Sequence, residues 1–184
     1  GSILAFAKMS KYRVLRWPVT LFIELIRGTP ILLQLYIGYF IVPQLFPALG
    51  LSDFASICVA LIINSSCYVS EIVRSGIQAV DHAQDEAARS LGLSHWQSML
   101  RVVLPQAVKN ILPALGNEFV MIIKETSLAS TFFIGDLMTS YLVVKGKTWL
   151  SLESLLIVGV IYFVMTFSLS KLIGVYERRL KTSD

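Results

Sequence analysis

A short run of polar residues stands near the middle of an apolar segment in the second half of the chain: Lys124, Glu125, Thr126 and Ser127. If the segment is helical, Lys124 lies about 18 Å beyond Leu112, near the middle of a bilayer. A charge at that depth costs roughly 2.5–3.5 kcal/mol on insertion scales, so it faces a bundle interior or a cavity. These side chains could bind the ammonium and carboxylate of a zwitterionic solute, and the alternative is a structural ion pair with another helix.

Three further polar residues inside apolar segments are candidates for the same pathway: Asn64, Tyr68 and Glu118. Asn64 adjoins two serines, small residues that let helices approach closely, so it serves either the pathway or helix packing. Nearer the inner end of that segment, Glu71 and Arg74 are predicted to form a structural ion pair. A backbone that becomes irregular after Glu125 would add free peptide groups to the pathway.

Residues for covalent or metal chemistry are few. The only histidines are His82 and His95, and the two cysteines, Cys58 and Cys67, lie in one apolar segment. We therefore expect no metal site, no disulfide framework and no cofactor on this chain. The sequence offers no Ser/His/Asp or His/Cys constellation, so we do not expect an enzyme.

The elements that position these residues are predicted to be membrane-spanning helices. Of the 184 residues, 55% are hydrophobic and 15% are charged, and three stretches carry no charge: 30–52, 54–70 and 154–170. Each stretch, alone or with flanking residues, reaches the roughly 20 apolar residues that span a bilayer. With the interrupted stretch 111–134, the pattern predicts an all-α, polytopic transmembrane bundle. Its four spans are expected at about 30–46, 54–76, from 110, and 151–175.

Shorter elements flank these spans. Residues 11–27 mix basic and aromatic side chains and predict an interfacial helix, which Gly28-Thr29-Pro30 redirects into the first span. Pro43 and Pro47 are expected to break that span near the outer surface, and residues 135–147 to form an outer connection. Residues 3–9 look like the end of a truncated spanning helix, and Gly1-Ser2 could be a cloning scar. We interpret residues 1–184 as a single transmembrane domain.

The basic residues predict the orientation of the chain. Thirteen of the 16 Lys and Arg residues stand before the first span, between the second and third, or after the last. The alternate loops hold only Lys145 and Lys147. Because basic residues concentrate in cytoplasmic loops, the connection at residues 77–109 and the C-terminus are predicted to be cytoplasmic.

Residues 81–105 of that connection are predicted to fold into two short helices. Asp81 and Ser94 are each followed three residues later by glutamine, as in a capping box, and Gly92 supplies a C-cap between them. Asp85 and Arg89 have the spacing of an i,i+4 ion pair. Apolar stripes are expected from Ala87, Ala88 and Leu91, and from Trp96, Met99, Leu100 and Val103. Such a unit would be rigid enough to transmit force.

This segment resembles the EAA loop of ABC importer permeases. The match consists of Glu86-Ala87-Ala88, then Gly92, then Val102-Val103-Leu104-Pro105, with Val102 where the family usually has isoleucine. Other segments are similar to the polar amino-acid branch: Arg27-Gly28-Thr29-Pro30, Tyr68-x-x-Glu71-x-x-Arg74-x-Gly76, Gly116-Asn117 and Lys124-x-Thr126-Ser127-Leu128. The chain departs from that branch at Ala83 and near Phe133, where glycine is usual.

The resemblance implies a type I importer permease of the bacterial cytoplasmic membrane. In that family the loop docks in a cleft of an ATP-binding cassette ATPase, which binds the ATP and Mg. The coupling residues implied here are Glu86, Ala87, Ala88, Gly92, Leu93 and Trp96. Trp96 and Met99 either pack beneath the loop or enter the cleft. The other implied partners are a second permease chain, identical or related, an external substrate-binding protein and an amino acid. Three carboxylates in or near the spans against one lysine favour a basic amino acid.

Other interpretations account for less of the sequence. Residues 86–103 also resemble a DNA-binding helix-turn-helix, but both flanks enter the membrane, so we expect no nucleic acid partner. Gly146-Lys147-Thr148 lacks the first glycine of a phosphate loop, because residue 141 is tyrosine. A secondary carrier or channel for small polar solutes would share the spans and is the alternative function, but it would have no use for the cytoplasmic helix pair.

Overall fold

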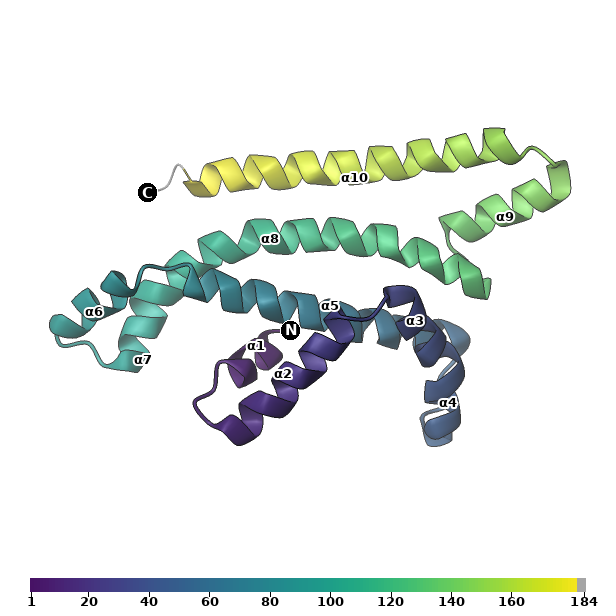
Figure 1. The fold of residues 1–184 in the computed structure, drawn as a ribbon. Helices are drawn as coiled ribbons and strands as arrows, with labels where there is room; N and C mark the ends of the chain where they lie inside the picture. Colours follow the sequence, from purple (N-terminus) through teal and green to yellow (C-terminus); the bar gives the residue numbers. More distant parts are fainter. Residues whose placement is uncertain (182–184) are drawn as a thin grey trace. The chain divides into compact units, whose positions relative to one another are not determined.

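The computed structural model describes the backbone of residues 1–181 and the side chains of residues 1–178. The elements within that range are helices, as the apolar pattern predicts (Figure 1). The α-helices are α1 Ser2–Lys8, α2 Arg13–Arg27, α3 Ile31–Tyr36, α4 Val42–Leu45, α5 Asp53–Gln78, α6 His82–Ser90, α7 His95–Ser98, α8 Leu104–Glu125, α9 Leu137–Thr148 and α10 Ser151–Lys181. They are interrupted by π-turns at Ile37–Ile41 and Met99–Val103 and by 3₁₀ segments at Pro47–Leu49 and Thr126–Phe132.

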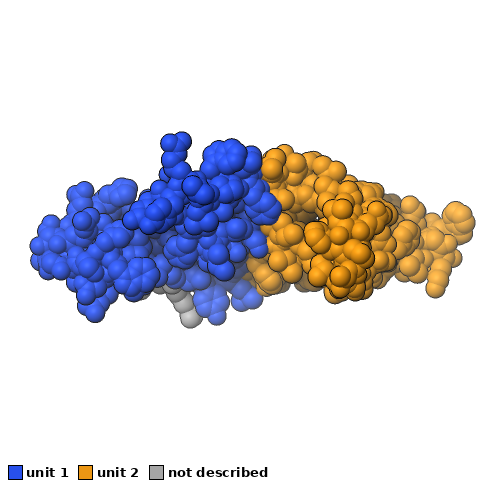
Figure 2. Space-filling view, turned by 90° about the horizontal axis from the view of Figure 1, so that it is seen from below, with its two compact units in different colours: residues 1–23, 66–118, 172–184 blue, residues 24–65, 119–171 orange. Residues whose placement is uncertain are grey.

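The chain divides into two compact units, which Figure 2 shows in blue and orange. Unit 1 combines residues 1–23, 66–118 and 172–184, and unit 2 combines residues 24–65 and 119–171. Helices α2, α5, α8 and α10 contribute residues to both units. The connection at residues 77–109, predicted to be cytoplasmic, lies in unit 1, whereas the polar run at residues 124–127 belongs to unit 2. The interpretation of the chain as a single domain stays a prediction.

By length and composition, α5 and α10 are each able to cross a membrane. Two bent pairs of helices also qualify: Arg13–Arg27 with Ile31–Leu45, at 105°, and His95–Phe132 with Leu137–Thr148, at 44°. If each bent pair is one span, the described residues contain up to four, the predicted number, but two of these spans then include α2 and α9, which the sequence assigns to an interfacial helix and an outer connection. Helix α8 begins earlier than the expected start near residue 110, and it gives way to a 3₁₀ segment after Glu125, as expected.

The 105° bend between α2 and α3 occurs at Gly28-Thr29-Pro30, where the sequence predicts a change of direction. Pro30 has no N–H, so it cannot donate a helical hydrogen bond to the Ile26 carbonyl. Three other donors reach that carbonyl: Thr29 N at 3.4 Å, Thr29 Oγ1 at 3.3 Å and, at the shortest distance, Gln34 Nε2 at 2.6 Å. Gln34 is 8% exposed and also accepts from Asn64 Nδ2 at 2.8 Å, which links the bend to α5. A buried amide that no sequence pattern marked therefore fixes this bend.

Each π-turn in the described chain ends two residues before a proline: Ile37–Ile41 precedes Pro43, and Met99–Val103 precedes Pro105. In a regular α-helix the proline ring collides with the carbonyl four residues earlier, and a wider turn moves that carbonyl away. Helix α4 consequently runs through Pro43 and ends before the next proline. The expectation that Pro43 itself breaks the first span is therefore wrong.

Each unit has a small apolar core of its own. The buried members in unit 1 are Ala5, Val73, Ile77, Val80, Val103, Ala107 and Ile111. Ala5 has no exposed surface, so it anchors α1, the helix expected over residues 3–9. A β-carbon on Gly76 would overlap Cγ1 of Ile111, which explains why a glycine stands where α5 approaches α8. The buried members in unit 2 are Leu35, Ile57, Ala60 and Ala129.

The expected interfacial helix and outer connection correspond to α2 and α9. Helix α2 covers most of residues 11–27, and of its side chains only Ile23 is buried. Helix α9 occupies most of the connection at residues 135–147. Phe133, before that connection, has a φ of +54°, so the departure from the usual glycine places a bulky residue in the left-handed region.

Candidate functional site

The cytoplasmic connection contains the two short helices that its pattern predicts, α6 and α7 (Figure 1). Ser94 and Gln97 form the expected capping box: Gln97 N donates to Ser94 Oγ at 3.3 Å, and Ser94 N donates to Gln97 Oε1 at 2.9 Å. At α6, Asp81 Oδ1 accepts a backbone N–H at 2.9 Å, but Gln84 accepts from another side chain, 3.4 Å away. The first box is therefore incomplete, although both helices begin at a side-chain cap.

Gly92 makes the turn between the two helices. Its φ is +89°, a conformation that L side chains rarely adopt, so the turn requires glycine. Gly92 N donates to Arg89 O at 3.0 Å and Leu93 N donates to Ala88 O at 3.3 Å, the paired bonds of a Schellman motif. A β-carbon at Gly92 would meet open space, so backbone strain and not collision disfavours a substitution.

A side-chain hydrogen bond joins the two helices, and we call residues 81–98 the hairpin. Ser98, which has no exposed surface, donates to Asp85 Oδ1 at 2.5 Å. None of the ion pairs within residues 1–178 joins Asp85 to Arg89, so that expectation is wrong. Ala88, 5% exposed, also faces inward. The hairpin is thus fixed at its caps, at its turn and between its helices.

Four residues of the hairpin that point away from its buried contacts are exposed: Glu86, Ala87, Leu91 and Trp96. We call these four residues the exposed face. Leu91 is 86% exposed and Trp96 is 68% exposed, high values for large apolar side chains. Successive helical residues point in different directions, so Ala88 is buried while its neighbour Ala87 is exposed. The stripe expected from Ala87, Ala88 and Leu91 is therefore split between two sides.

The π-turn at Met99–Val103 divides the second expected stripe. Met99 packs against the core of unit 1 and Val103 belongs to it, whereas Trp96 and Leu100 are exposed. Met99 and Val103 are four residues apart, and the same spacing continues inward through Ala107 and Ile111 of α8. Trp96 and Met99 were each expected either to pack beneath the loop or to enter the cleft of the ATPase. Met99 packs beneath the loop, whereas Trp96 is exposed and does not.

The polar run in the membrane begins where helix α8 ends. Thr126 Oγ1 donates to Ile123 O at 2.8 Å, and Ser127 Oγ donates to Lys124 O at 2.5 Å. These hydroxyls satisfy carbonyls at the change from α-helix to 3₁₀ geometry, where lipid offers no donor. Lys124 is exposed and Glu125 is half-buried, and within residues 1–178 neither forms an ion pair. The alternative was a structural ion pair between one of these residues and another helix, and residues 1–178 contain no such pair.

The other three pathway candidates differ in setting. Asn64 is 2% exposed; its Nδ2 donates to Gln34, and its Oδ1 is buried without a hydrogen-bond partner in the described chain. Tyr68 and Glu118 are half-buried members of unit 1, whereas Asn64 and residues 124–127 belong to unit 2. That all seven candidates line one pathway stays a prediction.

The ion pair predicted between Glu71 and Arg74 is present and has a third member. Arg74 Nη2 lies 2.8 Å from Glu71 Oε2, and Lys8 Nζ lies 2.8 Å from Glu71 Oε1. Lys8 stands 63 positions earlier, so no spacing in the sequence could connect it with Glu71. The three side chains tie α1 to the inner end of α5.

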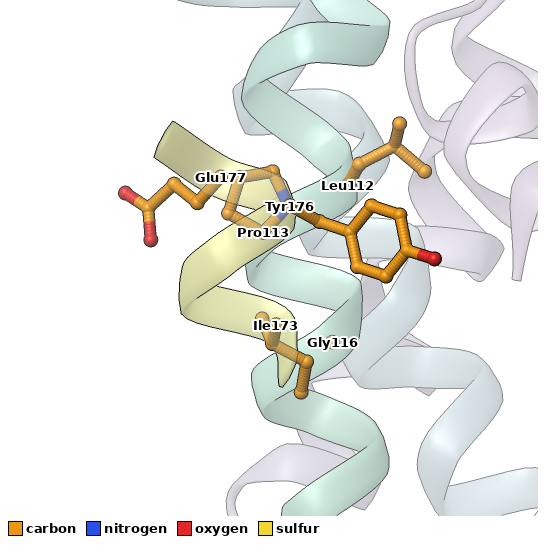
Figure 3. Close-up of a pocket in the computed structure, with 6 residues that line it drawn as sticks. All are labelled: Leu112, Pro113, Gly116, Ile173, Tyr176 and Glu177. Atoms are coloured by element: carbon orange, nitrogen blue, oxygen red, sulfur yellow. The ribbon is translucent and has the colours of Figure 1, made fainter. Parts of the chain in front are cut away.

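A hollow of about 270 Å³ lies between α8 and α10 in unit 1 (Figure 3). Its lining residues are Leu112, Pro113, Gly116, Ile173, Tyr176 and Glu177. A β-carbon on Gly116 would lie 2.8 Å from Ile173 Cγ2, so glycine allows a close approach of the two helices. Tyr176 and Glu177 extend in opposite directions (Figure 3), which leaves the hollow mainly apolar and indicates helix packing. Among the described residues, no group of three or more His, Cys, Asp or Glu could hold a metal ion.

Known proteins share this sequence over most of their length. Residues 1–182 match the family described as "Binding-protein-dependent transport system inner membrane component". The chain is 40% identical to the "Arginine transport system permease protein ArtQ" of Bacillus subtilis (strain 168), covering 100% of this chain and 84% of that protein. It is 38% identical to the "L-cystine transport system permease protein TcyB" of the same organism, covering 97% and 76%. It is 36% identical to the "Putative glutamine transport system permease protein GlnP" of Rickettsia bellii (strain RML369-C), covering 100% and 84%.

Solved structures show the same fold. A crystal structure described as an amino acid ABC transporter with histidines contains a chain that matches with a TM-score of 0.87 and 44% identity, covering 96% of this chain and 82% of that one. An inward-facing structure of the MetNI methionine ABC transporter matches with a TM-score of 0.78 over 97% of this chain and 83% of that one, at 14% identity. The second likeness concerns the fold alone. This chain therefore belongs to the family of binding-protein-dependent transport system inner membrane components, the permease subunits of ABC importers.

Proposed function

We propose that the chain is the membrane-spanning subunit of an ATP-driven importer that carries polar amino acids, basic ones included, across the bacterial cytoplasmic membrane. As a permease subunit the chain is not an enzyme, and ATP hydrolysis takes place on a separate ATPase. Similar permeases are named for arginine, cystine and glutamine transport, which supports a polar amino acid substrate. ATP and Mg²⁺ would bind the ATPase, and this chain would need no cofactor.

The observation that carries the coupling role is the exposed face on a hairpin that is fixed at its caps, at its turn and between its helices. Large apolar side chains at the surface, such as Leu91 and Trp96, mark a contact with another protein. We assign that contact to the ATPase. Ala88, Gly92 and Leu93 would act indirectly, because they shape the turn and the inner side of the hairpin.

Movement of the hairpin would reach the membrane through unit 1. The hairpin follows α5 directly and continues through the π-turn into α8. Met99 and Val103 pack with Val73 and Ile77 of α5 in the same core. A displacement imposed when the ATPase closes would therefore shift the inner ends of α5 and α8 together, as in a rigid-body or hinge transition.

The polar run supports a cationic amino acid as the substrate. Thr126 and Ser127 donate their only hydroxyl protons to backbone carbonyls, so their oxygens remain acceptors toward a solute. The Glu125 carboxylate is also an acceptor, and these three groups suit an ammonium or guanidinium. Lys124 directly precedes them in the chain and would bind the substrate carboxylate.

The complete importer would contain further subunits. We propose two ATPase subunits, a second permease chain that is identical or closely related, and an external protein that delivers the substrate. The family description implies the ATPase and the binding protein, and the second permease chain is our addition to these two partners.

Transport into proteoliposomes tests this proposal. Vesicles that contain the assembled complex and external binding protein should take up an arginine or histidine tracer only when ATP reaches the ATPase. Glu125→Gln and Lys124→Gln should each reduce uptake at least tenfold, whereas the exposed Glu153→Gln, near the start of α10, should change it less than twofold. Uptake by the permease without the ATPase, driven by an ion gradient, would establish the alternative of a secondary carrier.

A further inference from the structure

A second hollow, of about 340 Å³, lies in unit 1 among α1, α2 and α5 and is unlike the apolar hollow between α8 and α10. It is lined by Lys8, Met9, Arg16, Thr20, Arg74 and Gln78. Three of these six side chains are basic and none is acidic. The hairpin and the polar run contribute nothing to it, so the proposed transport mechanism does not account for its charge.

The charges at this hollow are only partly balanced. The Glu71 carboxylate lies 2.8 Å from Lys8 Nζ and 2.8 Å from Arg74 Nη2, so one negative charge is shared between two cations. Arg74 is also held by Gln78 Oε1, 2.5 Å from its Nη1. Arg16 forms no ion pair within residues 1–178. The site therefore has an excess of positive charge and an arrangement that is already ordered by Glu71 and Gln78.

The position of the hollow is that of a membrane surface. Gln78 is the last residue of the spanning helix α5, and Arg74 stands about one turn before it. Helix α2, which supplies Arg16, exposes large apolar side chains along its length, among them Val14 at 89% and Trp17 at 70%. An amphipathic helix with a tryptophan beside an arginine is typical of the interface between headgroups and acyl chains.

We propose that this hollow binds the phosphate of an anionic phospholipid, whose acyl chains lie along the apolar side chains of α2. Guanidinium groups match the oxygens of a phosphate with paired hydrogen bonds, and Arg16 and Arg74 supply two of them. Basic pockets beside spanning helices on the cytoplasmic side are a known setting for acidic lipid headgroups. The exposed apolar side chains of α2 favour a lipid, because its acyl chains would cover them while its phosphate is bound in the hollow.

Native mass spectrometry of the purified, assembled transporter tests this assignment. The complex is titrated with equal amounts of phosphatidylglycerol and phosphatidylcholine of the same chain length, and the ratio of the two bound lipids is measured. The wild-type complex should prefer phosphatidylglycerol, and Arg16→Gln should lower that preference about fivefold, because it removes one of the two guanidinium groups that bind the phosphate. Arg13→Gln is the matched control, because Arg13 is an exposed arginine on the same helix that does not line the hollow. It should lower the preference less than twofold, and phosphatidylcholine binding should be unchanged in both variants.

Three results would overturn the assignment. Equal losses in the two variants would mean a general surface charge and no site. Full competition by millimolar inorganic phosphate would mean a site for a free anion. No preference in the assembled complex, as when an acidic residue of a neighbouring subunit fills the hollow, would exclude a lipid there. The measurement does not involve transport, so its failure would leave the proposed import function untouched.

Discussion

The hairpin at residues 81–98 and the 3₁₀ segment Thr126–Phe132 both interrupt the path between long helices, but different bonds stabilise them. The hairpin is held by two N-caps, a Schellman turn at Gly92 and one bond between its helices. In the 3₁₀ segment, the hydroxyls of Thr126, Ser127 and Ser130 donate to carbonyls three residues earlier, at 2.8, 2.5 and 2.7 Å.

The difference follows from the two environments. The hairpin is predicted to lie in water, which can satisfy any remaining polar group, so its side-chain bonds serve mainly to fix its shape. The 3₁₀ segment belongs to a predicted span, where an unsatisfied carbonyl has no solvent partner. A hydroxyl in a spanning segment is therefore first a partner of the backbone, and its role toward a solute is what the remaining lone pairs allow.

We expect the largest effect from Gly92→Val in the hairpin. A β-branched residue at a φ of +89° is strained by about 1–3 kcal/mol, so the turn should open and the exposed face should lose its orientation. Uptake per ATP hydrolysed in proteoliposomes should fall at least tenfold, while membrane insertion and subunit assembly are retained.

Gly159→Val is the matched control for that variant. Gly159 lies within helix α10, and a β-carbon there would meet open space, as at Gly92. Because its backbone is helical, the same substitution should leave coupling within twofold. Normal coupling in Gly92→Val would show that the turn does not transmit the movement of the ATPase.

The bend between α2 and α3 should be the next most sensitive feature. Gln34→Leu removes the shortest of three hydrogen bonds to Ile26 O and leaves the buried Asn64 Nδ2 without its acceptor. We expect a loss of about 2–3 kcal/mol of stability, seen as a lower Tm of the purified permease in detergent. Gln44→Leu, at an exposed position of α4, is the control, and a Tm equal to that of the control would mean that Gln34 does not hold the bend.

The sequence predicts the parts of this structure that depend on local pattern. The spans, the capping box at Ser94, the turn at Gly92 and the change of geometry after Glu125 all have signals within a few residues. The role of Gln34 had no such signal, because a single neutral amide within an apolar stretch does not form a periodic pattern. Pro43 was expected to break the first span, but α4 runs through it, because the preceding π-turn accommodates the proline and has no signal in composition.

The candidate site shows the same limit. The hairpin's matched residues were identified, but which of them face outward depends on the buried contacts of Ala88 and Ser98 with the rest of the hairpin. The pair between Glu71 and Arg74 is visible as i,i+3 spacing, whereas Lys8 joins it only through the packing of α1. Long-range contacts of this kind cannot be read from spacing.

A smaller effect is expected from Glu71→Gln in unit 1. The substitution removes the carboxylate shared by Lys8 and Arg74 at a position where the Glu71 side chain is 14% exposed. We expect a loss of about 1–2 kcal/mol, measured as a Tm shift in detergent, and the exposed Glu153→Gln should shift the Tm much less. Equal shifts for the two variants would mean that the three-residue cluster adds nothing to stability.

The smallest effect expected is a gain of stability at the end of the 3₁₀ segment. Phe133 has a φ of +54° and is 75% exposed, so Phe133→Gly relieves strain while losing little burial. The Tm should rise by the equivalent of about 1 kcal/mol. Phe133→Ala removes the aromatic ring but keeps the β-carbon, so the strain remains and the Tm should not rise. A lower Tm in the glycine variant would show that the aromatic ring stabilises this turn.

Crosslinking of the hairpin to the ATPase tests the coupling role most directly. A photo-reactive amino acid is placed at Trp96 on the exposed face, or at Trp149 between α9 and α10, which is 87% exposed and serves as the matched position. Irradiation of the assembled complex should attach the ATPase to the permease from position 96 and not from position 149. The absence of an ATPase adduct at position 96, or equal adducts at both positions, would contradict the assignment of the hairpin to the ATPase contact.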